Sequence, residues 1–583
     1  MIRLGLALLF ASGAVCAAPA WVARSDAYTR PVLQDTGKYQ PEESTELGDE
    51  SFDTQVADFK PHVYERALAD TEQRLADLRR ERAQEKDVKV RQDLDILIDS
   101  REKAIATMKL EHRYLLDYTN VGELVYGGLR ALLDPRNKPE RQKLALVRLK
   151  RYAGREAGYT PIATLVRARG EERLADTSLI GPYVREVEEG LNNNATYMNG
   201  IADLFKKAHV TGWESDFAAL QAQVKDYDDW VRTRILPRTR KEVRLPEAIY
   251  VNRLANVGVD IAPEQMIERA GFDFQEVRDE MQVVANTIAA RNHLPSSDYH
   301  DVIRELKKTS IPPDQLLPYY RERLKDIEGI IRAHDLVTLP AREANIRMAT
   351  PAESAQTPAP FMNPPRLIGN TGEYGEFVIP LGNPNAKSKA KMNDFDFAAA
   401  SWGVTAHEAR PGHELQFASM VEQGMSVARA RFAFNSTNVE GWGLYSEATI
   451  LPYMPPEGQL VALQLRLLRM ARAMLDPLIN LGRMTPEQGK QFLMKEVMLS
   501  EPFAQSEVDR YSYRMPGQAT AYYYGYVKLR ALKTLAEIAL GDRFDLKAFN
   551  DFIIAQGILP PALMKQAVLE EFIPAQQGKI AAK

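Results

Sequence analysis

Cysteine and histidine are scarce in this sequence. Its 583 residues include one cysteine and eight histidines, which excludes a disulfide-stabilised scaffold and a zinc site built from several cysteines. Any metal site must therefore use histidine and carboxylate side chains. An excess of charge of one sign is also absent, because 75 basic and 79 acidic residues give a formal net charge of −4. This balance provides no sequence-wide positive field, so we expect no nucleic-acid partner.

Apolar runs long enough for a transmembrane helix are absent as well. The one marked apolar run, residues 4–15, follows a basic residue and precedes small residues at 17–20, which is the layout of a secretory signal peptide. We therefore predict a signal peptide over residues 1–20 and a secreted or periplasmic protein. The alternative is a lipoprotein signal in which acylated Cys16 provides a lipid anchor, although Val15 is larger than such a processing site usually accepts.

The length and apolar content predict a folded, mainly helical protein with more than one hydrophobic core. Hydrophobic residues make up 45% of the chain, which argues against disorder, and single cores stop growing at about 250–300 residues. Helical periodicity is evident in much of residues 60–334 and again over 395–572. Residues 22–55 are polar and contain several turn formers, so we expect a loosely ordered leader there.

A proline-rich segment separates the two helical parts. Residues 350–365 contain five prolines, and we predict an extended linker there. This divides the chain into an N-terminal helical region over residues 21–349 and a region over residues 366–583 that carries the motifs described next. The best strand candidate, residues 373–379, follows the linker.

Two of the eight histidines flank a glutamate. Zinc hydrolases commonly place two histidine ligands on one helix face, beside a glutamate that activates water. Here His407 and His413 are six residues apart, which on a regular helix separates the rings by about 120°. Pro411 and Gly412 interrupt any such helix. Two outcomes are open: a local bulge that returns both rings to one face, or a break that leaves His413 near the start of a second helix.

A third candidate ligand lies 27 residues after His413. Glu440 and Glu447 are seven residues apart, so they share a face if the segment is helical. Two histidines and one carboxylate form an established catalytic zinc set with an open coordination position. Glu440 would complete this set, and Glu447 would orient a ligand or bind substrate. An ordinary surface helix would also account for this pair of glutamates.

A segment rich in tyrosine and arginine lies near the C-terminus, within residues 507–526. Tyrosines beside an arginine could donate hydrogen bonds to a developing oxyanion. Aromatic packing is the simpler explanation for this segment taken alone.

Together these motifs resemble the bacterial domain-of-unknown-function 885 family over residues 45–575. The matching segments are His407-Glu408-x-x-Pro411-Gly412-His413-x-x-Gln416, Glu440-Gly441-Trp442-x-Leu444-Tyr445-x-Glu447, Arg510-Tyr511 and Pro516-Gly517-Gln518-Ala519-x-x-Tyr522. That family is in turn similar to the gluzincin zinc peptidases.

The resemblance implies a mainly α, gluzincin-like fold with a small β-sheet and a deep cleft between two helical halves. It implies Zn²⁺ as cofactor, with residues 366–583 as the catalytic region. The implied zinc ligands are His407, His413 and Glu440, with Glu408 as general base and acid. The implied transition-state donors are Arg510, Tyr511 and Tyr522, and the residues expected to support the ligands or the substrate are Glu447, Gln416 and Tyr374.

The expected function is an exported zinc metallopeptidase that acts on short peptides through a water activated by Glu408. The strand around Tyr374 would hold an extended peptide by edge pairing. Two alternatives use the same residues: a zinc amidohydrolase acting on cell-wall material or acylated small molecules, and a non-catalytic periplasmic binding or scaffold protein. The presence of both histidines and all candidate carboxylates argues against the non-catalytic alternative.

Overall fold

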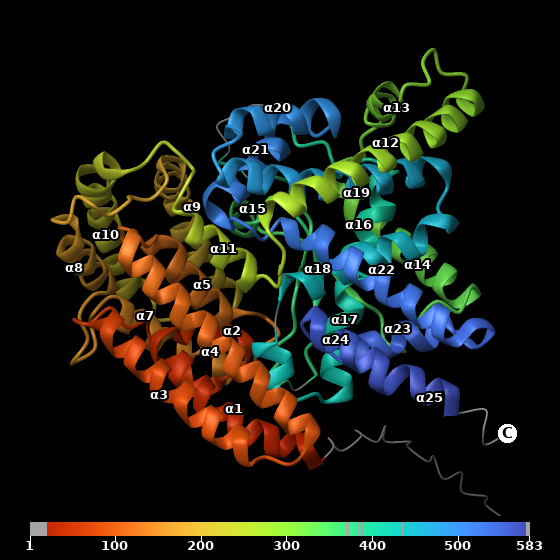
Figure 1. Cartoon of the computed structure of the whole chain (residues 1–583). Coiled ribbons are helices and arrows are strands. Elements are labelled where there is room, and N and C mark those ends of the chain that lie inside the picture. The colour runs from red at the N-terminus through yellow and green to blue at the C-terminus, as the bar shows by residue number, and fades with distance from the viewer. Residues whose placement is uncertain are drawn as a thin grey trace, which may run out of the picture.

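The structure is a computed structural model, and it describes residues 20–578 except 369, 371, 383, 386–389 and 434. The described chain is mainly helical with one small sheet (Figure 1), as predicted. Residues 1–19 of the predicted signal peptide, with Cys16, lie outside the described residues. None of the helices in the described part combines the length and the apolar character that crossing a bilayer requires.

The N-terminal part consists of helices. The first group is α1 (Ala20–Tyr39), α2 (Pro41–Leu47), η1 (Glu50–Phe52), α3 (Val63–Gln84) and α4 (Val88–Tyr114). The second is α5 (Val121–Leu133), α6 (Pro139–Gln142), α7 (Leu144–Tyr152), α8 (Ile162–Leu174), α9 (Val184–Lys207), α10 (Glu214–Trp230), η2 (Val231–Ile235) and η3 (Leu236–Arg238). The third is α11 (Glu247–Asn256), α12 (Pro263–Asn292), α13 (Tyr299–Leu306) and α14 (Pro313–Ala333).

A small mixed segment and a second series of helices follow. The mixed segment is β1 (Asn345–Met348), α15 (Pro351–Gln356), β2 (Phe361–Asn363) and β3 (Glu376–Ile379). The helices up to residue 480 are α16 (Ala400–Glu408), α17 (His413–Gln423), η4 (Ala428–Phe432), α18 (Ser436–Ile450), η5 (Leu451–Tyr453) and α19 (Pro456–Asn480). The remaining helices are α20 (Pro486–Glu496), α21 (Glu501–Asp509), η6 (Arg510–Arg514), α22 (Thr520–Leu540), η7 (Gly541–Arg543), α23 (Leu546–Ala555), α24 (Pro561–Ala567), η8 (Val568–Phe572) and α25 (Ile573–Gly578).

The expected loose leader over residues 22–55 is wrong, because α1 and α2 occupy most of it. The buried face of α1 includes Ser25 and Thr29 as well as Val22 and Val32. The Ser25 hydroxyl donates to the buried carboxylate of Asp93 in α4. Small polar residues thus fill part of this helix–helix contact, so the segment lacks the apolar periodicity by which a helix is recognised.

Residues 350–365 contain a helix and a strand and do not form the extended linker that we predicted. Pro351 lies in the first turn of α15, where its missing N–H costs nothing, and Thr350 and Glu353 cap that helix reciprocally. Residues of β2 pair antiparallel with β3. The prolines therefore begin a helix and follow a strand, and do not mark an unstructured connection.

The sheet has the order β1-β3-β2, with β1 parallel and β2 antiparallel to β3. Strand β3 falls within the predicted strand at 373–379. It is the central strand, with Phe377 opposite Ile346 on one side and Met362 on the other. Both edges of β3 are therefore occupied, and the expected edge pairing of a peptide with the strand next to Tyr374 is wrong.

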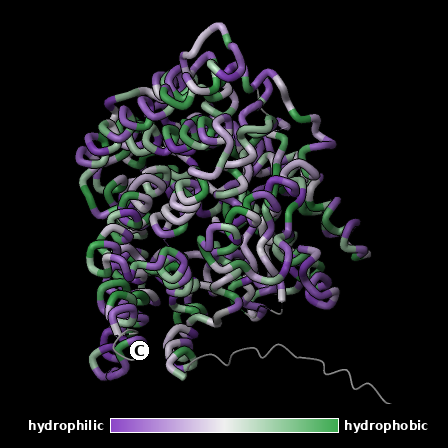
Figure 2. The backbone as a smooth tube through the Cα atoms, turned by 90° about the vertical axis from the view of Figure 1, so that its right-hand side faces the viewer, coloured by the Kyte–Doolittle hydropathy of each residue, from purple (hydrophilic) through white to green (hydrophobic). Residues whose placement is uncertain are grey.

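Two large hydrophobic cores account for most of the buried apolar residues, in agreement with the expectation from length. One is formed by residues between 57 and 235 together with Ala352. The other joins helices from both ends of the chain, for example Leu97 of α4, Trp442 of α18 and Phe572 of η8. Along most helices in Figure 2 hydrophilic and hydrophobic residues alternate, as half-buried helices require.

Helices α18 and α22 cross closely at a pair of glycines. A Cβ at Gly441 would lie 2.5 Å from the carbonyl carbon of Gly525, and a Cβ at Gly525 would lie 1.8 Å from the backbone oxygen of Thr437. Any side chain at these two positions would force the helices apart. The crossing therefore fixes the distance between the residues that α18 and α22 contribute to the site.

Gly525→Ala is expected to destabilise the protein although alanine favours helices. We expect the free energy of unfolding to fall by about 1–3 kcal/mol through overpacking, seen as a lower thermal or urea midpoint. The matched control is Gly329→Ala in α14, where nothing lies within 4 Å of the added Cβ and alanine stabilises by about 0.5–1 kcal/mol. Equal effects of the two substitutions would contradict the close crossing.

Candidate metal centre

His407 and His413 belong to two different helices. Helix α16 ends at Glu408, and Ala409 leaves the helical region with φ −100° and ψ −106°. The Arg410–Pro411 peptide bond is cis, and α17 begins at His413. Of the two outcomes left open by the sequence, the break is therefore correct and the bulge is not. The two rings nevertheless meet, with centroids 4.6 Å apart.

The turn between the helices is held in place by backbone contacts. A Cβ at Gly412 would lie 1.8 Å from the carbonyl oxygen of His407, so only glycine allows the chain to fold back this closely. The indole N–H of Trp442 donates to the carbonyl oxygen of Pro411 at 2.9 Å. Helix α18 thus holds the turn that brings the two histidines together.

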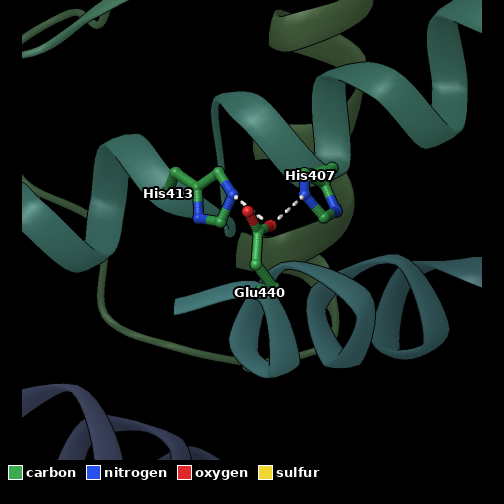
Figure 3. A group of neighbouring side chains, drawn as sticks. All are labelled: His407, His413 and Glu440. Atoms are coloured by element: carbon green, nitrogen blue, oxygen red, sulfur yellow. Dashed lines mark hydrogen bonds and ion pairs between the residues drawn. The ribbon is translucent and has the colours of Figure 1, made fainter. Parts of the chain in front are cut away.

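The carboxylate of Glu440 lies between the two imidazoles (Figure 3). Its Oε2 is 3.3 Å from Nε2 of His407 and 3.4 Å from Nε2 of His413. Among the described residues, this is the one group of three histidine, cysteine or acidic side chains whose ligand atoms all lie within 4.8 Å of one another. Two imidazole nitrogens and one carboxylate oxygen are a donor set that suits zinc and related divalent ions. The three residues therefore fit a metal ion.

Glu447 orients His407 from the side opposite Glu440. Its Oε1 lies 2.7 Å from Nδ1 of His407 and 3.0 Å from Nη2 of Arg469. The ring is further confined by Gly443, where an added Cβ would lie 2.4 Å from Cε1 of His407. This arrangement directs Nε2 of His407 toward Glu440 and leaves Glu447 outside the ligand set.

Burial and charge act in opposite directions on the residues of the centre. Burial alone would lower the pKa of His407, but hydrogen bonds to Glu440 and Glu447 outweigh it and raise the pKa to about 9. Burial would raise the pKa of Glu440, yet the two histidines hold that pKa well below its usual range. Glu447 behaves in the same way, with its pKa lowered by Arg469 and His407 against burial. The positive charges of the histidine and arginine side chains and the negative charges of Glu440 and Glu447 thus stabilise one another.

Glu408 follows His407 directly at the end of α16. Burial raises the pKa of Glu408, and the two histidines oppose that rise only in part. Within the described part of the chain, its carboxylate forms no hydrogen bond or ion pair. It is the acidic side chain of this cluster that is free to engage a water molecule or a substrate.

Tyr522 and Arg510 approach the centre from α22 and η6. The ring of Tyr522 stacks on that of His407, with centroids 6.1 Å apart, and its hydroxyl accepts a hydrogen bond from Nη2 of Arg510 at 2.9 Å. Gln518 accepts another from Arg510 and donates to Oε1 of Glu440 at 3.4 Å. The structure therefore brings Tyr522 and Arg510 to the group, together with Gln518 and Arg469, which the sequence did not single out as site residues.

Three other predicted residues have partners outside the ligand group. The fully buried Tyr511 donates its hydroxyl to Glu507 at 2.7 Å. The amide of Gln416 donates to Asn438 at 2.9 Å. The guanidinium of Arg342 lies 3.5 Å above the ring of Tyr374. The roles predicted for Tyr511 and Gln416 stay predictions, and so does a contact of the Tyr374 side chain with substrate; only the edge pairing expected beside Tyr374 is wrong.

Comparison with known proteins gives a family but no activity. The sequence profile described as "Bacterial protein of unknown function (DUF885)" matches residues 41–568. No curated protein sequence matches the chain. A solved structure named "putative lipoprotein" from Colwellia psychrerythraea is similar with a TM-score of 0.76 at 17% identity, over 95% of this chain and 100% of that one. Another, a "putative lipoprotein of unknown function" from Shewanella oneidensis, has a TM-score of 0.72 at 18% identity with the same coverage.

Proposed function

This chain belongs to the bacterial DUF885 family of unknown function, and we propose that it is a zinc-dependent peptidase. The observation that carries the proposal is the convergence of His407, His413 and Glu440, with ligand atoms within 4.8 Å of one another, beside the unpaired carboxylate of Glu408. The ligand side chains are only 3–15% exposed. Short or flexible peptides are therefore better substrates than folded proteins.

The roles of the side chains follow from their positions. Zinc held by His407, His413 and Glu440 would supply a Lewis acid that polarises the scissile carbonyl and acidifies water. A carboxylate oxygen of Glu408 would accept the proton of the attacking water and deliver it to the leaving amine. The hydroxyl of Tyr522, held by Arg510, would donate a hydrogen bond to the developing oxyanion.

We also infer that the protein is exported. The basic, apolar and small segments within residues 1–20 follow the order of a signal peptide. Both structural relatives are named "putative lipoprotein", and this name agrees with export. Acylation at Cys16 is the lipid-anchored alternative to release after cleavage.

Metal analysis of the purified protein should find about one zinc ion per chain. His407→Ala and Glu440→Ala each remove a ligand, so both should lose the metal. Glu447→Ala should retain zinc with an affinity lowered about 10–100-fold, because Glu447 only orients His407. The control is His62→Asn, at a histidine whose side chain is 81% exposed. A full equivalent of tightly bound zinc in the ligand variants would refute the assigned ligand set.

Glu408→Gln should retain the zinc and lose hydrolysis. The amide has nearly the same shape but cannot accept the proton of the water, and proton transfer by such a group contributes roughly 10²–10⁴-fold to the rate. The measurement is digestion of a peptide library by the wild type and by the variant, followed by mass spectrometry. Unchanged turnover would show that Glu408 is not the base.

Tyr522→Phe should reduce kcat by about 10²–10³-fold, the usual effect of removing one oxyanion donor, with the zinc content unchanged. Tyr526→Phe is the matched control, one turn further along α22. Its hydroxyl accepts a hydrogen bond from Arg530 at 3.2 Å and, among the described residues, forms none with the residues of the centre. If the two variants were equally active, the role of Tyr522 would be wrong.

A further inference from the structure

Two buried arginines, Arg469 and Arg472, and the partly buried Arg510 surround the ring of Tyr522 beside the candidate metal centre. Their guanidinium carbons lie 4.5 Å (Arg472), 5.1 Å (Arg510) and 5.8 Å (Arg469) from the ring centroid. A guanidinium taken out of water is stable only when a negative charge and hydrogen-bond acceptors replace its hydration. Each of the three is therefore expected to pair with a carboxylate.

Arg469 and Arg472 each have a carboxylate partner at hydrogen-bonding distance. Nη2 of Arg469 lies 3.0 Å from Glu447. Arg472 binds Glu507 with two hydrogen bonds of 2.7 and 2.6 Å, one to each carboxylate oxygen. Glu507 accepts a third hydrogen bond from Tyr511. Both of these carboxylates are thus already engaged.

Arg510 shares its carboxylate partner with Arg472. Its Nη1 forms an ion pair of 3.8 Å with Oε1 of Glu507, and both oxygens of Glu507 already accept hydrogen bonds from Arg472. Asp476, also close to Arg510, accepts hydrogen bonds from the backbone N–H of Gly517 and from Tyr250. Glu440 is held between the two histidines. Arg510 is therefore the arginine of this group with the weakest pairing, a long ion pair to a carboxylate that it shares.

The hydrogen-bonding groups of Arg510 are also incompletely used. Nη2 donates to the neutral partners Tyr522 and Gln518. Nε is buried without a partner among the described residues, and Nη1 donates no hydrogen bond there. Because 19% of the side chain is exposed, an incoming group can reach the guanidinium. The two N–H groups of Nη1 are therefore free to donate charge-assisted hydrogen bonds to a carboxylate.

We propose that Arg510 binds a carboxylate of the peptide substrate and so selects peptides cleaved next to that carboxylate. The inference rests on the proposed peptidase function. Gln518 connects Arg510 to Glu440, so the anchor lies one side chain away from the metal ligands. The carboxylate is either the C-terminal α-carboxylate, which makes the enzyme a carboxypeptidase, or an aspartate or glutamate side chain.

The experiment compares kcat/KM on three peptides of otherwise identical sequence. One ends in alanine with a free carboxylate, one ends in alanine amide, and one ends in glutamate amide. The wild type should cleave a peptide with a carboxylate on the order of 10- to 100-fold faster than alanine amide. In Arg510→Gln this ratio should fall to about one, and Arg510→Lys, which keeps the charge but not the planar guanidinium, should give an intermediate ratio. Arg483→Gln, at an exposed arginine paired with Glu264, is the control with the wild-type ratio.

The outcomes separate the inference from the function on which it rests. A faster reaction on the free alanine peptide alone identifies the α-carboxylate, and rescue by glutamate amide identifies a side chain. Equal rates on all three peptides by the wild type, or an equal loss on all three in Arg510→Gln, would overturn the anchor but leave the peptidase intact. If the wild type cleaves none of them, the peptidase proposal fails.

Binding of the same peptides provides a second test that does not require catalytic turnover. In calorimetry, Glu408→Gln should bind the carboxylate peptide more tightly than alanine amide. The double variant Glu408→Gln/Arg510→Gln should bind both equally, provided that its melting temperature shows it to be folded. An affinity difference that survives in the folded double variant would refute the role of Arg510.

Discussion

The position of the candidate site depends on how closely α18 and α22 can approach. Gly441 and Gly525 leave their contact without side chains, and a Cβ at Gly441 would lie 2.5 Å from Gly525. Glu440, Trp442 and Glu447 all project from α18, while Tyr522 projects from α22. Because protein interiors are close-packed, a helix displaced by one methyl group moves every side chain that it carries. Packing at two glycines thus sets the distance between the carboxylate of Glu440 and the ring of Tyr522.

Charge compensation is the second constraint on this region. His407, Arg469 and Arg472 each have a carboxylate partner within 3.0 Å, as burial of a cation demands. Such pairs orient side chains more than they stabilise the fold, since the desolvation of both partners offsets much of their attraction. Arg510 departs from this pattern, because its ion pair with Glu507 is longer, 3.8 Å, and the carboxylate is shared with Arg472. A weakly paired and partly exposed guanidinium is suited to binding an incoming anion.

Sequence reasoning selected the residues of the candidate site better than it described their surroundings. The types and spacing of His407, His413 and Glu440, with a resemblance of three motifs, were enough to select the three side chains that converge. Strand β3 and the mainly helical class were also predictable from periodicity and β-branched content. Arg469 was not, because a lone arginine on a helix carries no local signal. The same limit applied to α1, whose buried face includes Ser25 and Thr29, and to residues 350–365, where prolines occupy helix and strand ends that they also favour.

The long interval between the two histidines has a structural reason of its own. On a single helix, the backbone hydrogen bonds themselves hold two ligands on one face, and the spacing must be close to one turn. Here the ligands lie on two helices, so the interval reflects the length of the turn from Ala409 to Gly412. Because no helical hydrogen bonds link the two histidines, other contacts hold them together. These are the close approach of Gly412 to His407 within the turn and the hydrogen bond from Trp442 to Pro411. The positions of the two imidazoles therefore depend on α18, the same helix that carries Glu440, the third residue of the candidate centre.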